Sequence, residues 1–387
     1  MTRHHRLSLG ERSMKLAVVT LLAASTPACA GFKDLLGGTN VEAVATSVQK
    51  PANVAAYLEV TDNDDPVVDL EPKSFRIYED DKLLSAEEVS QRLLPRELVT
   101  NERVVILLDL GAKPPPSVID GFVKGVESFV ERVQGTLPVT VLAYDGAGGL
   151  RLVGDYPKVS GTGGSVSASS LRSLAPRDAS RDLNGAILKG IKELDGRLTQ
   201  QKKPVRVGTL LVLARGPDLA GRVTELQIEE ALEHKRYNVL GIGVGEETPH
   251  LDRIARAGVI HAQSEETFPI AFEEAASRVL KTHGKYYLVS YCSPARAGKR
   301  ALRIEVSYTN SSGSERSGSY YYDFDAQGFG PGCKSDTPPR FVIPRPANEA
   351  PPSSPPAESP DPAQATSGGA SPTNGEVAPP PDAPAYK

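Results

Sequence analysis

The sequence lacks any apolar run of the roughly 20 residues that a membrane-spanning helix requires. Its clearest apolar stretch, Leu16–Ala24 (LAVVTLLAA), is too short and is interrupted by Thr20. Basic residues precede this stretch and small residues follow it, which is typical of a secretory signal peptide. Met1 and Met14 are both available as its start. A buried core helix is the alternative, which the position at the N-terminal end disfavours. We therefore expect an exported protein with a soluble body.

Cysteine is scarce as well: the chain has only Cys29, Cys292 and Cys333. Residues 26–29 (TPAC) resemble a bacterial lipobox, in which the cysteine receives a lipid, although Thr26 stands where leucine is usual. Residues 28–30 (ACA) also fit ordinary signal-peptide cleavage. An odd number of cysteines in an exported chain leaves one thiol to explain. If Cys29 carries lipid, the other two can pair in an oxidising compartment. We therefore predict a lipoprotein facing the periplasm or the cell surface, with a soluble secreted protein as the alternative.

Several motifs that would indicate an enzyme or a nucleic-acid-binding protein are missing. Charge is nearly balanced at −4 and no basic stripe occurs, which argues against a nucleic-acid partner. The Gly-rich segment 161–165 lacks a P-loop lysine, the segment 241–245 (GIGVG) lacks the full dinucleotide-binding spacing, and no Gly-x-Ser-x-Gly elbow follows. The histidines at 234, 250, 261 and 283 lack zinc-type spacing. His234 and His283 fall near expected helix ends, where surface positions are expected. We predict no catalytic residue.

The C-terminal segment 335–387 is rich in proline, alanine, serine and glycine. Such a composition buries too little apolar surface to offset the loss of chain entropy. It predicts a disordered, extended tail: a passive one, a spacer, or a segment that binds a partner.

Two flanking segments have the pattern of β-strands. Residues 55–60 (AAYLEV) and 75–78 (FRIY) precede the middle of the chain, and three similar runs lie between 285 and 324. We expect the two segments to pack as one split β domain, with Cys292 and Cys333 flanking the later strands. A disulfide between them would add about 4 kcal/mol of stability in the chain-entropy model. The cluster Asp62, Asp64 and Asp65 is interpreted as an acidic turn rather than a calcium site, because it lacks the glycine and glutamate of an EF-hand.

The middle of the chain alternates between strands and helices. Apolar runs at 104–109, 138–144, 207–214 and 237–244 have the continuous pattern of strands that are covered on both faces. Apolar residues at helical spacing occur at 118–133, 183–194, 225–235, 251–257 and 270–280. This order predicts a doubly wound, mostly parallel, Rossmann-like α/β sheet. We divide the chain into a signal peptide (1–29), an N-terminal β segment (30–98), an α/β domain (99–283), a C-terminal β segment (284–334) and a tail (335–387).

Val104–Asp109 and Tyr237–Gly243 (YNVLGIG), in this helical context, resemble a von Willebrand factor type A domain. Phe75–Lys82 (FRIYEDDK) is similar to the hairpin that precedes such domains in a group of bacterial exported proteins. Tyr286–Lys299 is similar to the segment that follows them. The resemblance covers about 45–330 and implies a function in protein binding.

The resemblance also implies a metal-ion-dependent adhesion site. In that site, Asp-x-Ser-x-Ser, a threonine and a second aspartate hold a magnesium-type cation, which takes an acidic group from the partner. This chain keeps Asp109, but the other positions match Gly111, Lys113, Arg181 and Arg215. Lysine and arginine offer no ligand oxygen and repel a cation. We therefore expect no metal here and no other cofactor.

We hypothesise that Arg215 or Lys113 takes the metal's place and pairs with Asp109, since a guanidinium suits a carboxylate. The cationic rim would then bind an acidic protein partner directly, or it would be a purely structural cluster of salt bridges. The alternative is an envelope hydrolase or metal-dependent enzyme with an unconventional site built from Asp145, Asp182 and Asp218. The sequence favours a non-catalytic protein that acts in binding or assembly.

Overall fold

The computed structural model describes residues 38–159, 166–233, 235, 237–244 and 249–341. The expected signal peptide with Cys29, the Gly-rich segment 161–165, His234 and the chain after Phe341 lie outside the described residues. None of the described helices has the length and apolar character that crossing a membrane requires.

The middle of the chain forms a six-stranded sheet with the order β12-β11-β10-β7-β8-β9. Its strands are β7 (Thr100–Asp109), β8 (Val139–Tyr144), β9 (Arg151–Tyr156), β10 (Val205–Ala214), β11 (Tyr237–Val244) and β12 (Val259–Ala262). Strand β9 pairs antiparallel with β8, and the other pairings are parallel. The predicted mostly parallel sheet is therefore confirmed, with β9 and β12 as strands that the sequence pattern did not indicate.

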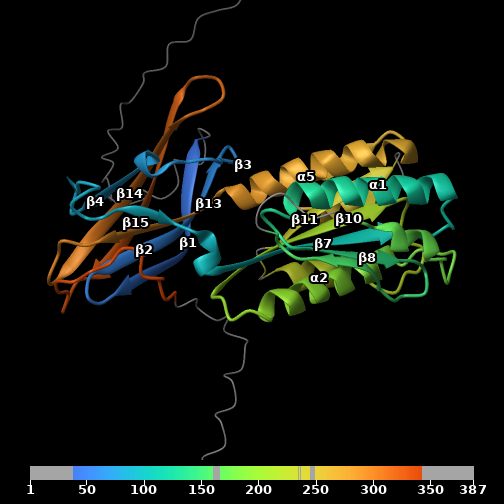
Figure 1. The fold of residues 1–387 in the computed structure, drawn as a ribbon, viewed down its shortest axis with the longest axis horizontal. Helices are drawn as coiled ribbons and strands as arrows, with labels where there is room; N and C mark the ends of the chain where they lie inside the picture. Colours follow the sequence, from blue (N-terminus) through green and yellow to red (C-terminus); the bar gives the residue numbers. More distant parts are fainter. Residues whose placement is uncertain (1–37, 160–165, 234, 236, 245–248, 342–387) are drawn as a thin grey trace, which may run out of the picture. The chain divides into compact units, whose positions relative to one another are not determined.

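Helices cover both faces of this sheet (Figure 1). One face packs against α1 (Pro116–Val133) and α5 (Phe268–Gly284), and the other against α2 (Leu183–Thr199), α3 (Glu225–Leu232) and α4 (Pro249–Ile254). The central strand β7 explains this arrangement. Val104, Ile106 and Leu108 belong to the first core, while Val105 and Leu107 belong to the second, because successive side chains of a strand point to opposite faces. A continuous apolar run is therefore what a doubly covered strand needs.

The flanking segments form two further sheets. One contains β1 (Thr39–Gln49), β2 (Asn53–Asp62), β3 (Asp65–Pro66), β6 (Arg92–Leu94) and β13 (Tyr286–Cys292). The other, here called sheet B, has the order β15-β14-β4-β5, with β4 (Phe75–Glu79), β5 (Lys82–Leu83), β14 (Lys299–Thr309) and β15 (Glu315–Asp325). Strand β13 pairs with β2 and β14 pairs with β4, so each sheet joins the two segments. Both sheets share one apolar core. The expected split β domain is confirmed as a β-sandwich.

Short elements complete the described chain. The 3-10 helices are η1 (Pro72–Ser74), η2 (Arg96–Leu98), η3 (Ser169–Ser173) and η4 (Glu265–Thr267). Two hairpin turns have left-handed backbone at both central residues, Asn63 and Asp64 in one and Asp80 and Asp81 in the other. Asparagine and aspartate tolerate this conformation better than most residues, so the acidic clusters mark tight turns.

The predicted disulfide is present between Cys292 and Cys333. Beyond it the chain continues in an ordered path, where the sequence predicted disorder from Ser335 onward. Ser335 and Phe341 are buried, and the carbonyl of Arg340 accepts a hydrogen bond from Ser47 Oγ at 3.1 Å. Phe341 packs in an apolar cluster with Tyr57 and Tyr286. Residues 335–341 therefore belong to the packed part of the chain, where the Phe341 ring adds apolar burial.

Candidate functional site

The candidate site lies at the carboxyl edge of the six-stranded sheet, where Asp109 ends β7. Asp109 is fully buried and its carboxylate accepts three hydrogen bonds. The backbone N–H groups of Gly111 and Arg215 donate to it at 2.8 Å each, and Arg181 Nε donates to Oδ2 at 2.5 Å. Burial raises the pKa of Asp109, whereas the Arg181 guanidinium and the two amides oppose that rise. The side chain is thus fixed as one half of a buried ion pair.

Arg181 occupies the centre of the site, two residues before α2 begins. Its side chain is 6% exposed, and Nη1 also donates to the Pro217 carbonyl at 3.3 Å. The guanidinium packs directly against Gly216, where an added Cβ would lie 2.6 Å from Nη1. At Gly111 a Cβ would lie 2.9 Å from the Ser180 carbonyl and 3.0 Å from the Asp109 carboxylate. Two glycines therefore make the space that this buried arginine fills.

Neither Arg215 nor Lys113 provides the cation that pairs with Asp109, so that hypothesis is corrected. Arg215 reaches Asp109 only through its backbone amide, because its side chain turns away toward η4. There Nε contacts Glu265 Oε1 at 2.5 Å, and Nη1 donates to the Gly111 carbonyl at 2.8 Å. Lys113 is exposed in the loop before α1, where it and Ala112 adopt left-handed backbone. The pairing partner is Arg181.

The remaining acidic residues of this edge do not converge on one point. Asp145 pairs with Arg151 at 3.1 Å and accepts from the amides of Ala147 and Arg177. Asp182 lies 3.3 Å from Arg222 and 3.9 Å from Lys189. Asp218 accepts from the amides of Asn184 and Gly221. Throughout the described ranges, no three histidine, cysteine or acidic side chains are grouped so that they could hold a metal ion. Each carboxylate instead has its own cation or amide partners.

The exposed charges at this edge of the sheet are opposite in sign to several of its buried charges. Asp109, Asp145 and Asp182 are buried, whereas Lys113, Arg177 and Arg222 are exposed. Leu219, which is 61% exposed, lies in the same loop as Arg222. The loop is held to the centre of the site because the Arg181 carbonyl accepts from the amides of Leu219 and Ala220. The edge therefore presents cations and one apolar side chain to solvent.

Sequence reasoning missed Arg177, Leu219 and Arg222, since each lies in a loop without a recognisable motif. It also misplaced His283, which was expected at the surface. His283 is fully buried at the end of α5, with Nε2 3.0 Å from Thr209 Oγ1 and Nδ1 3.9 Å from Glu102. Thr209 lies on β10 and Glu102 on β7, so this end of α5 packs against the six-stranded sheet rather than facing solvent.

No family model and no curated protein match the sequence. Among solved structures, the chain is similar to proximal thread matrix protein 1 from the mussel byssus, with 13% identity over 49% of each chain and a TM-score of 0.38. A von Willebrand factor type A structure from Catenulispora acidiphila is 12% identical over 75% of this chain and 72% of that one, with a TM-score of 0.37. The PilB minor pilin from Streptococcus sanguinis is 10% identical over 63% and 78%, with a TM-score of 0.35.

The chain thus spans about half the length of the mussel protein's chain. At these identities and scores, none of the three structures assigns a role to a residue of this chain.

Proposed function

We propose that this chain is a lipid-anchored envelope protein whose α/β part binds an acidic protein partner without a metal ion. The observation that carries the proposal is the buried pair of Arg181 and Asp109. A cation beside Asp109 would have to displace a guanidinium that is 6% exposed and tightly packed. Breaking a buried ion pair costs several kcal/mol, so displacement is strongly disfavoured.

The charge distribution supports an acidic partner. Asp109, Asp145 and Asp182 are buried and paired with cations, whereas Lys113 and Arg177 are exposed to an approaching ligand. Charged groups around an interface speed association with a complementary partner and exclude like-charged ones. Leu219 adds an exposed apolar side chain among these cations, which suits the usual pattern of an apolar anchor within a polar rim. The proposed ligand is a protein segment that carries carboxylates beside an apolar residue.

The location follows from the disulfide and the N-terminal segment. A disulfide between Cys292 and Cys333 indicates an extracytoplasmic, oxidising compartment. With these two cysteines paired, Cys29 is the remaining thiol of the sequence, and we assign it the lipid. If Cys29→Ser leaves the protein in the membrane fraction, the lipid anchor is wrong.

Crosslinking and pull-down from native membranes test the binding site. We compare the wild type with Lys113→Glu/Arg177→Glu, and use Lys299→Glu on β14 as a control because Lys299 is an exposed cation of the β-sandwich. Charge reversal at the edge should weaken capture of the partner about tenfold or more, and the control should not. Equal capture by all three proteins would exclude this edge as the binding site.

A further inference from the structure

A buried imidazole and a buried carboxylate face each other at the end of α5. His283 lies in the last turn of this helix and is fully buried, and its Nε2 lies 3.0 Å from Thr209 Oγ1 on β10. The side chain of Glu102 on β7 is 8% exposed, and its Oε1 lies 3.9 Å from His283 Nδ1. Figure 1 shows the three elements that meet here, α5, β7 and β10.

The two facing atoms are unusual because neither has a hydrogen-bond partner among the described residues. Their separation of 3.9 Å is too long for a hydrogen bond. Arg96 on η2 approaches the same carboxylate, but its Nη2 lies 3.7 Å from Glu102 Oε2, which is also too long. Most buried polar side-chain atoms in folded proteins are hydrogen-bonded, so this exception requires an explanation.

The protonation state of His283 decides how well it can contact Glu102. A neutral imidazole has one N–H group, whereas an imidazolium has two. If the neutral ring donates from Nε2 to Thr209, its Nδ1 lone pair faces the carboxylate and repels it. If the proton is on Nδ1 instead, the ring faces Glu102 with an N–H but without a charge. The imidazolium donates from both nitrogens and adds the attraction between opposite charges, so protonation gives the strongest contact.

The charged and titratable groups around His283 and Glu102 are Arg96 on η2, Tyr57 on β2, and Lys285 and Tyr286 where β13 begins. Arg96 Nη1 donates to the His283 carbonyl, so its charge opposes a second cation, as burial does. The Arg96 side chain is 19% exposed and partly hydrated, which weakens this opposition. Lys285 pairs with Glu59 at 2.5 Å. Burial, and then the Glu102 carboxylate, raise the pKa of Tyr57, which keeps it neutral.

Two features favour the imidazolium over these opposing effects. The Glu102 carboxylate is buried beside the ring, where attraction between charges is less screened than at the surface. His283 also lies in the last turn of α5, where the partial negative charge of a helix C-terminus stabilises a cation. The balance therefore favours a contact that strengthens when His283 binds a proton.

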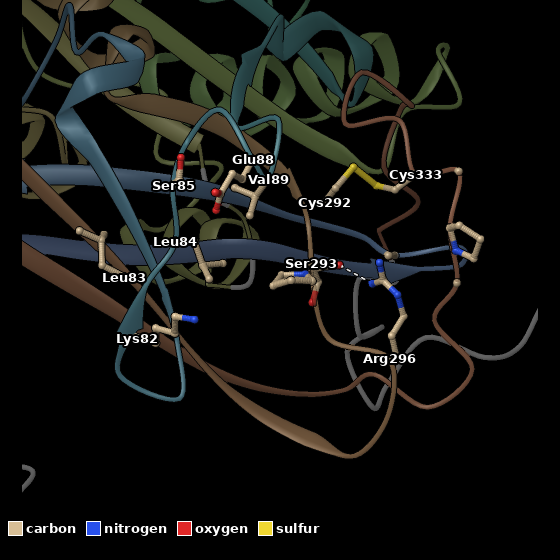
Figure 2. Close-up of a pocket in the computed structure, with 15 residues that line it drawn as sticks. Lys82, Leu83, Leu84, Ser85, Glu88, Val89, Cys292, Ser293, Arg296 and Cys333 are labelled. Atoms are coloured by element: carbon tan, nitrogen blue, oxygen red, sulfur yellow. Dashed lines mark hydrogen bonds between the residues drawn. A yellow bond between two sulfur atoms is a disulfide. The ribbon is translucent and has the colours of Figure 1, made fainter.

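The compartment makes such a contact relevant. Figure 2 shows the Cys292–Cys333 disulfide beside a pocket of about 280 Å³, and this disulfide indicates an extracytoplasmic location. A protein outside the cytoplasm meets the pH of its surroundings directly. Histidine is the side chain that ordinarily changes its charge between about pH 5 and pH 8.

We propose that His283 and Glu102 form a proton-dependent ion pair, which holds the end of α5 against β7 and β10 when the imidazole is protonated. As the pH rises through the range in which histidine loses its proton, the pair weakens and the end of α5 opens more often. This inference is independent of the proposed binding site, because Glu102 and Asp109 lie near opposite ends of β7.

Hydrogen exchange of the full, disulfide-bonded chain tests the proposal. Exchange rates are divided by the intrinsic rate at each pH, which leaves the protection that the structure provides. From about pH 5 to pH 8, the protection of amides 281–286 should fall about tenfold. The amides of α3 (Glu225–Leu232) are the internal reference, because this helix covers the opposite face of the sheet. Their protection should stay constant.

Three variants identify the groups responsible. His283→Gln and Glu102→Gln each remove one charge of the pair, so each should abolish the pH dependence at 281–286. Glu102→Gln keeps the size of the side chain and preserves the test if His283→Gln does not fold. His261→Gln is the matched control, because His261 is an exposed histidine of β12, 3.6 Å from Asp252. It should keep the pH dependence of the wild type.

Four results would overturn the proposal: protection at 281–286 that does not change with pH, protection that rises with pH, a fall of equal size in α3, or a fall that Glu102→Gln leaves intact. None of these readouts involves an outside partner, so they are separate from the test of the binding site.

Discussion

The α/β part and the β-sandwich both bury apolar cores, but they differ in how the chain contributes their strands. The α/β part comes from one continuous stretch, and its central strand β7 is covered by helices on both faces. The β-sandwich comes from two stretches that meet through the pairings of β2 with β13 and of β4 with β14. The first concentrates its buried charge at one edge, while the second closes its later segment with a disulfide. We therefore expect different substitutions to destabilise the two parts.

The largest loss of stability is expected when the buried cation of the α/β part is removed. Arg181→Ala leaves the Asp109 carboxylate buried without its counter-ion, which should cost about 3–5 kcal/mol of unfolding free energy. Arg278→Ala is the control, because its exposed pair with Glu274 should contribute less than about 1 kcal/mol. Urea unfolding measures both variants. A loss for Arg181→Ala as small as that of the control would show that the pair contributes little.

The disulfide is the corresponding weak point of the β-sandwich. Cys292→Ser/Cys333→Ser opens a loop with a sequence separation of 41, and should cost about 2–4 kcal/mol. Hydrogen exchange should show the greatest loss of amide protection in β13, β14 and β15, with β7 and β10 less affected. Equal losses in all five strands would mean that the two parts unfold as a single unit, and the comparison would not hold.

Alkaline pH should also destabilise the β-sandwich through its buried tyrosines. Burial raises the pKa of Tyr287 and of Tyr320 from 10.0 to about 12 each. A pKa that is higher in the folded state means that the neutral form is favoured there. The stabilisation is therefore complete below about pH 10 and is lost as the pH rises toward 12. Unfolding free energies across this range should fall less steeply in Tyr287→Phe than in the wild type, and parallel curves would contradict the assignment.

The smallest effect concerns a helix end in the α/β part. Thr224 forms a capping box with Gln227 at the start of α3, so Thr224→Ala should cost about 1 kcal/mol. Thr224→Ser keeps the hydroxyl and should remain within a few tenths of a kcal/mol of the wild type. Thermal unfolding of the two variants measures this difference in stability. Indistinguishable midpoints would show that the cap does not stabilise the protein.

The sequence predicted the elements whose apolar pattern is complete. The run Val104–Asp109 and the stripe of α1 each place apolar residues where burial needs them, and both were found as expected. Strands β9 and β12 escaped prediction because they lie at the sheet's edges, where Leu152 and His261 are exposed and the pattern is broken. Edge strands carry less of the periodic signal that identifies central ones.

The candidate site was predictable in its location but not in its pairing. Asp109 follows a buried parallel strand, which placed it at the carboxyl edge. Whether Arg181 or Arg215 faces it depends on two loop conformations and on the space left by Gly111 and Gly216. His283 and Phe341 were misjudged for a related reason, because their burial comes from segments distant in the sequence. The local sequence pattern around each residue does not predict such contacts.

Titration calorimetry with Mg²⁺ and Mn²⁺ tests the central claim most directly. The account predicts no saturable binding to the full chain, because the Arg181 guanidinium already occupies the carboxylate of Asp109. Micromolar binding that disappears in Asp109→Ala would contradict it, since the site would then be a metal centre after all.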